Sequence, residues 1–384
     1  MTLESAASLA SEDRVASDAD QADAAAWNTA WDEIGTDTGL DMGTTHLAPG
    51  VTGTTVAGPA NAVALSGLAA ALGEYAFAAG FGDGSVIQYA GEVGAGGPRI
   101  PRERVVISHE AAVTAVATVG GTVLSAGQDG TVRSGAGVVI APGGWCEHLT
   151  VAPAGNFFAV ACGRSVVLGT AAGETGRLED HPSSVSGLAT SPDGRQLAAS
   201  HYNGVTIWSL KSGAKVRTLS WKGSHIGVTW SPDGRFVVSA TQERELHVWD
   251  LATDKDFRLG GYATKVRAIA WLHDPAHLVA SGADAITAWP FGDVGPGVLP
   301  PKEIGFGHNA TVSRVAVHPA KPQLAGAYSN GTVLVGGVKK GEAAFVRNPD
   351  GVPVTALAYT AGGLLVAATR SGAIDVISFD QAVP

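Results

Sequence analysis

The feature that most constrains this chain is a segment of about forty residues that recurs along it. Its clearest copies contain the turns Ser191–Arg195 and Ser231–Arg235, which both read Ser-Pro-Asp-Gly-Arg and begin 40 positions apart. Self-similarity at this period is typical of repeat architectures, in which each copy forms one supersecondary unit. The repeat therefore predicts the fold, whereas the function must be inferred from what departs from the repeat.

Each unit contains short apolar segments separated by turns. In one unit these segments are Ile226–Trp230, Phe236–Ser239 and Leu246–Asp250, and they are rich in β-branched and aromatic residues. Proline at the second turn position presets φ, and glycine at the fourth suits a tight reversal between antiparallel strands. The pattern predicts hairpins, and hence an all-β chain.

The copies can be aligned on the turn between the second and third strands, with spacings of 34 to 46 residues. This alignment predicts eight units, with seven as the alternative. The aligned turns are Asp83-Gly84, Asp129-Gly130, Gly163-Arg164, Asn203-Gly204, Glu243-Arg244, Asp284-Ala285, Asn330-Gly331 and Ser371-Gly372.

The chain resembles the WD-repeat family over roughly residues 55–384. The resemblance rests on the Trp249-Asp250 ending, the two Ser-Pro-Asp-Gly turns and a histidine at the start of several units. It implies a β-propeller with one four-stranded antiparallel blade per repeat. The histidines are His109, His181, His225 and His308.

The resemblance also implies a hydrogen-bonded structural tetrad of histidine, serine or threonine, turn aspartate and tryptophan. No unit has all four residues in ideal form, and the unit with His109, Ser125 and Asp129 has Gly135 in place of the tryptophan. The nearest sets are His225, Ser239, Glu243 and Trp249, and His181, Ser200, Asn203 and Trp208.

The charge of the chain is concentrated at its N-terminus. Residues 1–42 hold ten acidic residues and one basic residue, which gives −9 of the formal net charge of −10. We therefore expect an acidic tail at 1–44 and a propeller at 45–384. Within the tail, an amphipathic helix is expected near 23–34, because Trp27, Trp31 and Ile34 fall on one helical face.

Three fates are open for this tail. The helix could pack on its own propeller, insert into a groove on a partner protein, or remain disordered. Self-association through the tail is a further possibility. After it, the segment near 51–57 reads as a strand that joins the last blade and closes the ring, which removes an exposed sheet edge.

The sequence predicts a cytoplasmic location. Cys146 and Cys162 show neither metal-type spacing nor a disulfide framework, and the N-terminus is acidic where a signal peptide would be basic and then apolar. The apolar stretch Asn61–Gly82 is interpreted as a buried strand pair, since its end coincides with an aligned turn, and no membrane association is expected.

The search for catalytic or cofactor chemistry is negative. His109-Glu110 lacks the second histidine of a zinc-protease helix, and His273–His277 occupies a turn position where polar residues are expected. The glycine-rich run at 91–98 precedes no helix that could bind phosphate. We expect no cofactor, no metal, no enzyme activity and, for a nearly neutral propeller, no nucleic-acid binding.

Surface recognition is the function that remains. The expectation is a scaffold or accessory subunit that binds another protein, with a small-ligand or enzymatic site at the central channel as the alternative. The resemblance to WD repeats implies that the mouth of the central channel is lined by Thr114, Ser186, Gly227, Arg267, Ser313 and Thr355. The candidate partner-binding residues are Trp27, Trp31, Ile34, Phe81, Gln128, Tyr202, Arg244, Lys265, Arg267 and Arg370.

Overall fold

The computed structural model describes residues 47, 50–59, 61–68, 74–274, 276–292, 295–307, 309–339 and 341–379. All of these residues belong to the unit Thr44–Pro384. They form β-strands and turns only, and no helix among them is long and apolar enough to cross a membrane. The predicted tail helix and His308 lie outside the described residues.

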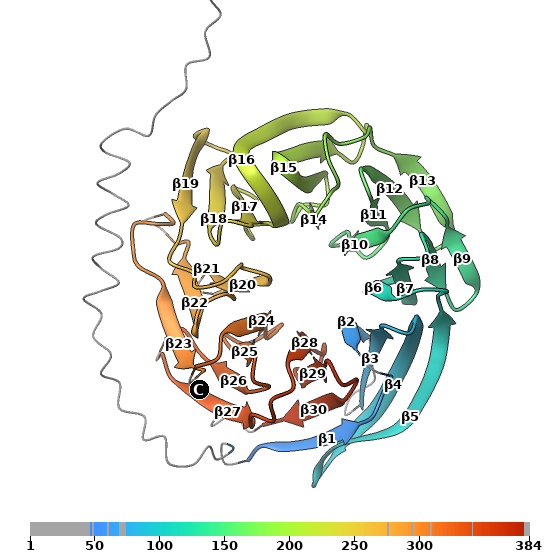
Figure 1. Ribbon diagram of the computed structural model, residues 1–384, viewed down its shortest axis with the longest axis vertical. Helices are drawn as coiled ribbons and strands as arrows, with labels where there is room; N and C mark the ends of the chain where they lie inside the picture. The colour runs from blue at the N-terminus through green and yellow to red at the C-terminus, as the bar shows by residue number, and fades with distance from the viewer. Residues whose placement is uncertain are drawn as a thin grey trace, which may run out of the picture. The chain divides into compact units, whose positions relative to one another are not determined.

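Four-stranded antiparallel blades follow one another around a ring (Figure 1). In blades 1 to 7 the first strand segment in sequence lies innermost, and successive segments pair outward through hairpins. The Asn61–Gly82 stretch forms the first two strands of blade 1, as predicted. Blade 1 contains β2 (Ala62–Leu68), β3 (Glu74–Phe81), β4 (Ser85–Gly94) and β5 (Gly97–Ser108). Blade 2 contains β6 (Val113–Val119), β7 (Thr122–Gly127), β8 (Val132–Ser134) and β9 (Gly137–Ile140). Blade 3 contains β10 (Cys146–Val151), β11 (Phe158–Cys162), β12 (Ser165–Thr170) and β13 (Gly173–Arg177).

One continuous sheet of six strands holds the next two blades. An extended strand of the length of β15 would hold its ends roughly 45 Å apart, yet the Leu210 N–H donates to the Arg195 carbonyl at 2.9 Å. β15 therefore folds back on itself, near Asn203, whose φ of 67° is left-handed. β16 pairs with β15 through its first half and with β17 through its second half. The six strands are β14 (Gly187–Thr190), β15 (Gln196–Ser209), β16 (Lys215–Trp230), β17 (Phe236–Thr241), β18 (Leu246–Asp250) and β19 (Lys255–Leu259).

The last blade is completed by the first strand of the described chain. β1 pairs antiparallel with β30, with Thr52 opposite Ser378 and Val56 opposite Ile374. This confirms the predicted closing strand near 51–57. Blade 6 contains β20 (Ile269–His273), β21 (Ala276–Ala280), β22 (Ala285–Pro290) and β23 (Lys302–Phe306); blade 7 contains β24 (Val312–Val317), β25 (Leu324–Tyr328), β26 (Val333–Gly336) and β27 (Ala343–Arg347); blade 8 contains β28 (Val354–Tyr359), β29 (Leu365–Thr369), β30 (Ile374–Ser378) and β1 (Thr52–Val56).

The all-β propeller prediction is confirmed. Hydrogen bonding joins the described strands into seven sheets, six of four strands and one of six. Because β15 and β16 each supply two strand segments, the six-stranded sheet comprises two four-stranded units, and the ring has eight blades. Each of the eight aligned turns falls between the second and third strand segments of its blade.

The hydrophobic core is divided among the interfaces between neighbouring blades. One cluster joins blades 1 and 8 and includes Phe77, whose ring stacks on Tyr89 with centroids 5.0 Å apart. Further clusters join blades 2 and 3 and blades 6 and 7. The stabilising apolar contacts are thus distributed around the ring. The loops that join the strands are left available for recognition.

Candidate functional site

Two sets of loops share one face of the propeller, which we call the loop face. They are the turns between second and third strands and the connections between successive blades, and backbone hydrogen bonds join them. The Gln128 N–H donates to the Ala112 carbonyl at 2.9 Å in blade 2, and the Arg370 N–H donates to the Pro353 carbonyl at 3.0 Å in blade 8. Each turn therefore lies beside the connection that opens its own blade.

Most predicted partner-binding residues within the described chain lie on this loop face. Tyr202 is 57% exposed. The exposed cationic side chains are Arg244, Lys265, Arg267 and Arg370, and Gln128 is half-buried. Trp27, Trp31 and Ile34 lie outside the described residues, so their role stays a prediction.

Phe81 was wrongly predicted to be a surface residue. It is fully buried at the end of β3, within the core between blades 1 and 8. A Cβ at Gly58 would lie only 2.8 Å from its ring. β3 runs to Phe81, so this residue belongs to the strand and packs inward instead of lying in the turn.

Trp145 is an exposed aromatic residue that the sequence reasoning missed. It lies between β9 and β10 and is 61% exposed. Gly143 and Gly144 precede it with φ values of 82° and 72°, which only glycine adopts readily. A single tryptophan outside the strand pattern, after a Pro-Gly-Gly turn, was the available signal.

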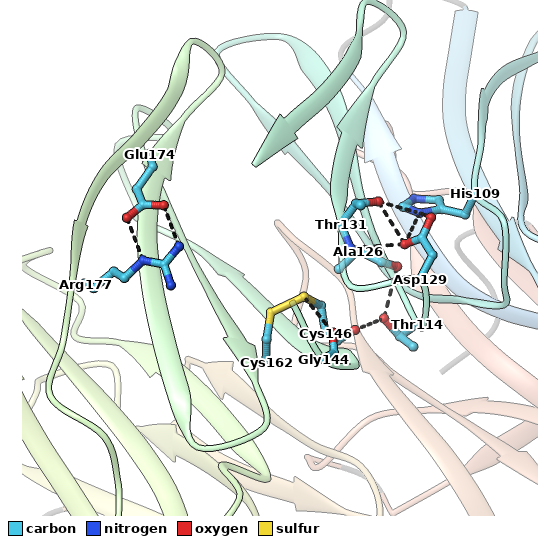
Figure 2. The surroundings of a disulfide bond; sticks show 10 residues. All are labelled: His109, Thr114, Ala126, Asp129, Thr131, Gly144, Cys146, Cys162, Glu174 and Arg177. Atoms are coloured by element: carbon cyan, nitrogen blue, oxygen red, sulfur yellow. Dashed lines mark hydrogen bonds and ion pairs between the residues drawn. A yellow bond between two sulfur atoms is a disulfide. The ribbon is translucent and has the colours of Figure 1, made fainter. Parts of the chain in front are cut away.

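The cysteine next to Trp145 forms a disulfide, contrary to the expectation from sequence (Figure 2). Cys146 opens β10 and lies directly opposite Cys162, the last residue of β11, and the sulfur atoms are bonded. The cross-link therefore fixes the backbone beside Trp145. Sequence separation alone did not show that the two residues face each other across a strand pair.

The blade 2 histidine makes the most complete hydrogen-bond network of the predicted tetrads (Figure 2). His109 Nδ1 lies 3.0 Å from the Asp129 carboxylate, as Figure 2 shows. His109 Nε2 lies 2.7 Å from Ser125 Oγ. The Thr131 hydroxyl donates to Asp129 Oδ1 at 2.8 Å, and the Glu110 N–H donates to Oδ2 at 3.2 Å. Burial alone would raise the pKa of Asp129, but these hydrogen bonds outweigh it and lower the pKa to about 2.

The residue types in this network are those of a catalytic triad, but its environment is structural. The Ser125 hydroxyl belongs to a fully buried residue inside the sheet, and His109 is 7% exposed. A nucleophile must reach a substrate carbonyl. The network therefore fixes the connection between blades 1 and 2.

In blade 5 the predicted tetrad forms without its acidic member. His225 Nδ1 lies 2.7 Å from Ser239 Oγ, and Nε2 lies 2.9 Å from the Trp221 carbonyl. The Trp249 ring lies 5.7 Å from the His225 ring. Glu243 is exposed, and a backbone carbonyl takes the place predicted for it.

In blade 4 only two of the four predicted residues meet. Trp208 Nε1 donates to His181 Nε2 at 2.9 Å, while His181 Nδ1 pairs with the Arg164 carbonyl. The Ser200 hydroxyl has no hydrogen-bond partner, and Asn203 accepts instead from the Gly223 N–H at 3.2 Å.

The reason lies in the strand register. Ser239 pairs with Val228 and Ser125 with Val116, but the corresponding pair in blade 4 is Leu188 with Ala199. Ser200 is therefore displaced by one residue, and a shift of one residue moves a side chain to the opposite face of the sheet. The predicted role of Ser200 in a tetrad is thus wrong.

Blade 6 contains a related network that the sequence reasoning did not find. Trp289 Nε1 donates to the Tyr262 hydroxyl at 2.8 Å, and this hydroxyl lies 3.2 Å from Thr287 Oγ1. Tyrosine replaces the histidine found in blades 2, 4 and 5, so a search for histidine at the start of each unit could not detect it.

Four of the residues predicted to line the channel mouth join neighbouring blades instead. Thr114 donates to the Cys146 carbonyl, Ser186 to that of His225 and Thr355 to that of Ala62. Ser313 donates to the Val354 carbonyl at 3.3 Å. Each hydroxyl thus links one inner strand to the next, and the Thr355 bond crosses the point of ring closure. Gly227 does not belong to this set, because the register places Ile226 at the equivalent position.

Arg267 is the remaining residue that was predicted to line the channel mouth, and its side chain is charged. It is exposed and precedes β20, where its backbone N–H donates to the Ser281 hydroxyl at 3.1 Å. Its charge interacts with that of Arg314 on β24, which belongs to the next blade. Burial and the charge of Arg267 together lower the pKa of Arg314.

No metal site is apparent: no group of three or more potential metal ligands occurs among the described residues. His273 and His277 flank the turn between β20 and β21, as the turn interpretation predicted. A cavity of about 700 Å³ lies between blades 1 and 2 and is lined in part by Val105, Val123 and Gly135, where blade 2 lacks a tryptophan.

The model of the family described as "WD domain, G-beta repeat" matches residues 173–209 and 213–250, which run from the outer strand of blade 3 through blade 4 and the first three strand segments of blade 5. This match shows that the chain contains WD repeats in the middle of the propeller. The matched region contains both Ser-Pro-Asp-Gly turns and the Trp249-Asp250 ending.

Similar proteins match parts of the propeller. "WD repeat-containing protein AAC3" of Dictyostelium discoideum is 28% identical over 156 residues, which is 40% of this chain and 33% of that protein. "Cell division cycle 20.1, cofactor of APC complex" of Arabidopsis thaliana is 28% identical over 83 residues, which is 20% of this chain and 18% of that protein. The chain thus aligns with a third or less of the length of these relatives.

A solved structure supports the fold alone. The computationally designed Ika8 protein superposes with a TM-score of 0.67 at 17% identity, over 84% of this chain and 98% of that one. Since a designed protein and this chain share little sequence, the likeness carries no functional information.

Proposed function

We propose that this WD-repeat propeller is a non-catalytic scaffold or accessory subunit that binds another protein through its loop face. The observation that carries the proposal is the pair of exposed aromatic residues Trp145 and Tyr202 on a face that also presents exposed cationic side chains. Tryptophan, tyrosine and arginine are the residues most enriched at binding hot spots. A relative named as a cofactor of a complex supports an accessory role.

The test compares the loop face with the opposite face. Full-length tagged protein is cross-linked in its source cells and recovered, and the co-purifying proteins are quantified by mass spectrometry. We expect at least one near-stoichiometric partner, which the double variant Trp145→Ala/Tyr202→Ala loses by tenfold or more. Arg195→Ala is the matched control, because Arg195 is exposed at the turn between the first two strands of blade 4. Equal recovery of that partner with both variants would refute the loop-face proposal.

The cytoplasmic location stays a prediction. It rests on the N-terminal composition alone, because the Cys146–Cys162 disulfide removes the cysteine argument. Alkylation of thiols in cells lysed directly into denaturant tests it, because both cysteines are buried in the folded protein: two reactive cysteines per chain are expected in a reducing compartment, and none in an oxidising one.

A ligand site at the channel mouth is the second candidate function, as the alternative from sequence proposed. The observation that favours it is the placement of Arg267, just before the inner strand β20, near Arg314 on the inner strand β24 of the next blade. Self-association through the N-terminal tail also stays a prediction, and comparing the solution mass with and without residues 1–42 tests it.

A further inference from the structure

Arg314 is held rigidly by the backbone at the inner strand of blade 7. Its Nε donates to the Thr355 carbonyl of blade 8 at 2.7 Å, and Nη1 donates to the Ser313 carbonyl at 2.8 Å. A guanidinium group has five N–H donors, so three remain after these two bonds. The orientation of the group is therefore fixed before any ligand binds.

The side chain of Arg314 is half-buried, yet no carboxylate among the described residues forms an ion pair with it or with Arg267. Cationic side chains taken out of water are ordinarily paired, because an unpaired charge loses its hydration without compensation. The second cation nearby adds repulsion and further disfavours the unliganded state.

The inner-strand residues level with Arg314 in the two adjacent blades are small. Arg314 pairs with Ala327, and the corresponding inner-strand residues are Ala268 in blade 6 and Ala356 in blade 8. Blades 4 and 5 have Gly187 and Gly227 at this level. Small side chains here leave the unused guanidinium N–H groups unobstructed by neighbouring strands.

We propose that Arg267 and Arg314 form an oxyanion-binding site at the channel mouth, which takes a phosphate or carboxylate group. The planar fork of Arg314 suits bidentate binding of such a group. Arg267 closes the site from the adjacent blade and is free to move, since its side chain is exposed. The same chemistry would accept a small free anion or an acidic or phosphorylated peptide side chain.

The test uses full-length protein and two probes at matched ionic strength. Inorganic phosphate represents a free anion, and a capped peptide of four glutamates represents a peptide carboxylate; sodium chloride is the control. Binding is measured by isothermal titration and by the rise in Tm, because a ligand of the folded state stabilises it by mass action. We expect at least one probe to bind wild type, and which probe binds more tightly identifies the source of the anion.

The variants separate an anion site from a purely structural arginine. Arg267→Gln and Arg314→Gln should each weaken binding at least tenfold, and Arg314→Lys should weaken it less than Arg314→Gln, since lysine keeps the charge but not the fork. Arg370→Gln, at another exposed loop-face arginine, should bind like wild type. If Arg314→Gln does not fold, Arg267→Gln decides alone. Binding that is absent in wild type, or unchanged in Arg267→Gln, would overturn the proposal.

Discussion

Blades 2 and 5 fix their opening loops with the same histidine–serine pair but complete it in different ways. In blade 2 the Asp129 carboxylate supports His109, and Gly135 occupies the tryptophan position. In blade 5 Trp249 packs beside His225, and a backbone carbonyl replaces the carboxylate. The blade with the weaker tryptophan signature thus has the fuller polar network.

This difference shows that the opening loop of a blade must be held in place, but that different sets of residues can do so. An apolar ring and a buried charge can each supply the missing stabilisation, and blade 6 achieves a similar result with Tyr262. The comparison predicts that the two blades will respond to different substitutions and to different ranges of pH.

The largest effect is expected from Trp249→Ala in blade 5. Trp249 is 5% exposed and packs against the rings of His225 and His247, so its truncation leaves a large cavity. We expect a loss of about 4 kcal/mol in the free energy of unfolding, measured by urea denaturation. A loss below about 1 kcal/mol would show that the polar network, rather than the ring, stabilises blade 5.

The second effect concerns the carboxylate of blade 2. Asp129→Ala removes the buried acceptor of His109, Thr131 and the Glu110 N–H, and we expect a loss of about 3 kcal/mol. Glu243→Ala, at the aligned position of blade 5, should change stability by less than about 0.5 kcal/mol because this side chain is exposed. Equal losses in urea denaturation would contradict the comparison.

Acid should destabilise blade 5 before blade 2. Burial, assisted by the charges of His225 and Arg258, lowers the pKa of His247 to about 3, although Asp256 at 3.3 Å opposes this shift. A histidine with a lowered folded-state pKa takes up its proton more readily when unfolded. Its contribution is therefore complete above pH 6.5 and declines below it by about 1.4 kcal/mol per pH unit, or about 2 kcal/mol by pH 5.

The carboxylate of blade 2 responds at lower pH. The pKa of Asp129 is lowered to about 2, so its stabilising contribution is present above pH 4 and is lost between pH 4 and 2. Hydrogen exchange at pH 5 should show weaker protection in β17 and β18 than in β7 and β8. His247→Phe should flatten the decline between pH 6.5 and 5; an unchanged slope would exclude His247 as its cause.

A smaller effect is expected when blade 2 receives the residue it lacks. An added Cβ at Gly135 would meet only the Val106 carbonyl, at 3.5 Å, and the neighbouring cavity has space for a ring. Gly135→Trp should raise the free energy of unfolding by about 1 kcal/mol, through apolar burial and a more restricted unfolded chain. Gly135→Ala is the control for the backbone contribution, and a destabilised tryptophan variant would contradict this explanation.

The smallest change in stability is expected from substitutions of two serines whose positions in the strand register differ by one residue. Ser200→Ala removes a hydroxyl that has no hydrogen-bond partner, so stability should stay within about 0.5 kcal/mol of wild type or increase. Ser239→Ala breaks the bond to His225 and should cost about 1 to 2 kcal/mol. A larger loss for Ser200→Ala than for Ser239→Ala would contradict the register assignment.

The sequence was sufficient to predict the blades, because turn residues and apolar alternation recur in every copy. Asp83-Gly84 and Ser371-Gly372 marked turns even at the ends of the ring, where no tryptophan is present. The closing strand β1 was also predictable, since it alternates like a strand and a propeller must remove its open edge.

Much of the candidate site depended on register, which the sequence specifies poorly. Ser200 differs from a tetrad serine by one position, and Cys146 meets Cys162 only because β10 and β11 align those residues. Arg314 was overlooked because its partner lies one blade away. The serine and cysteine pairings lie within hairpins of consecutive strands, whose register is set by the turn and its length, so one residue more or less decides which side chains meet.

Ring closure by β1 also determines when this protein can finish folding during its synthesis. Thr52 leaves the ribosome 326 residues before its partner Ser378, and at about 5 to 20 residues per second this interval lasts roughly 15 to 65 s. Throughout it, blade 8 does not exist and both ends of the growing ring expose unpaired β edges. A circular permutant that places β1 directly after β30 would make these strands neighbours in translation and should shorten that vulnerable interval.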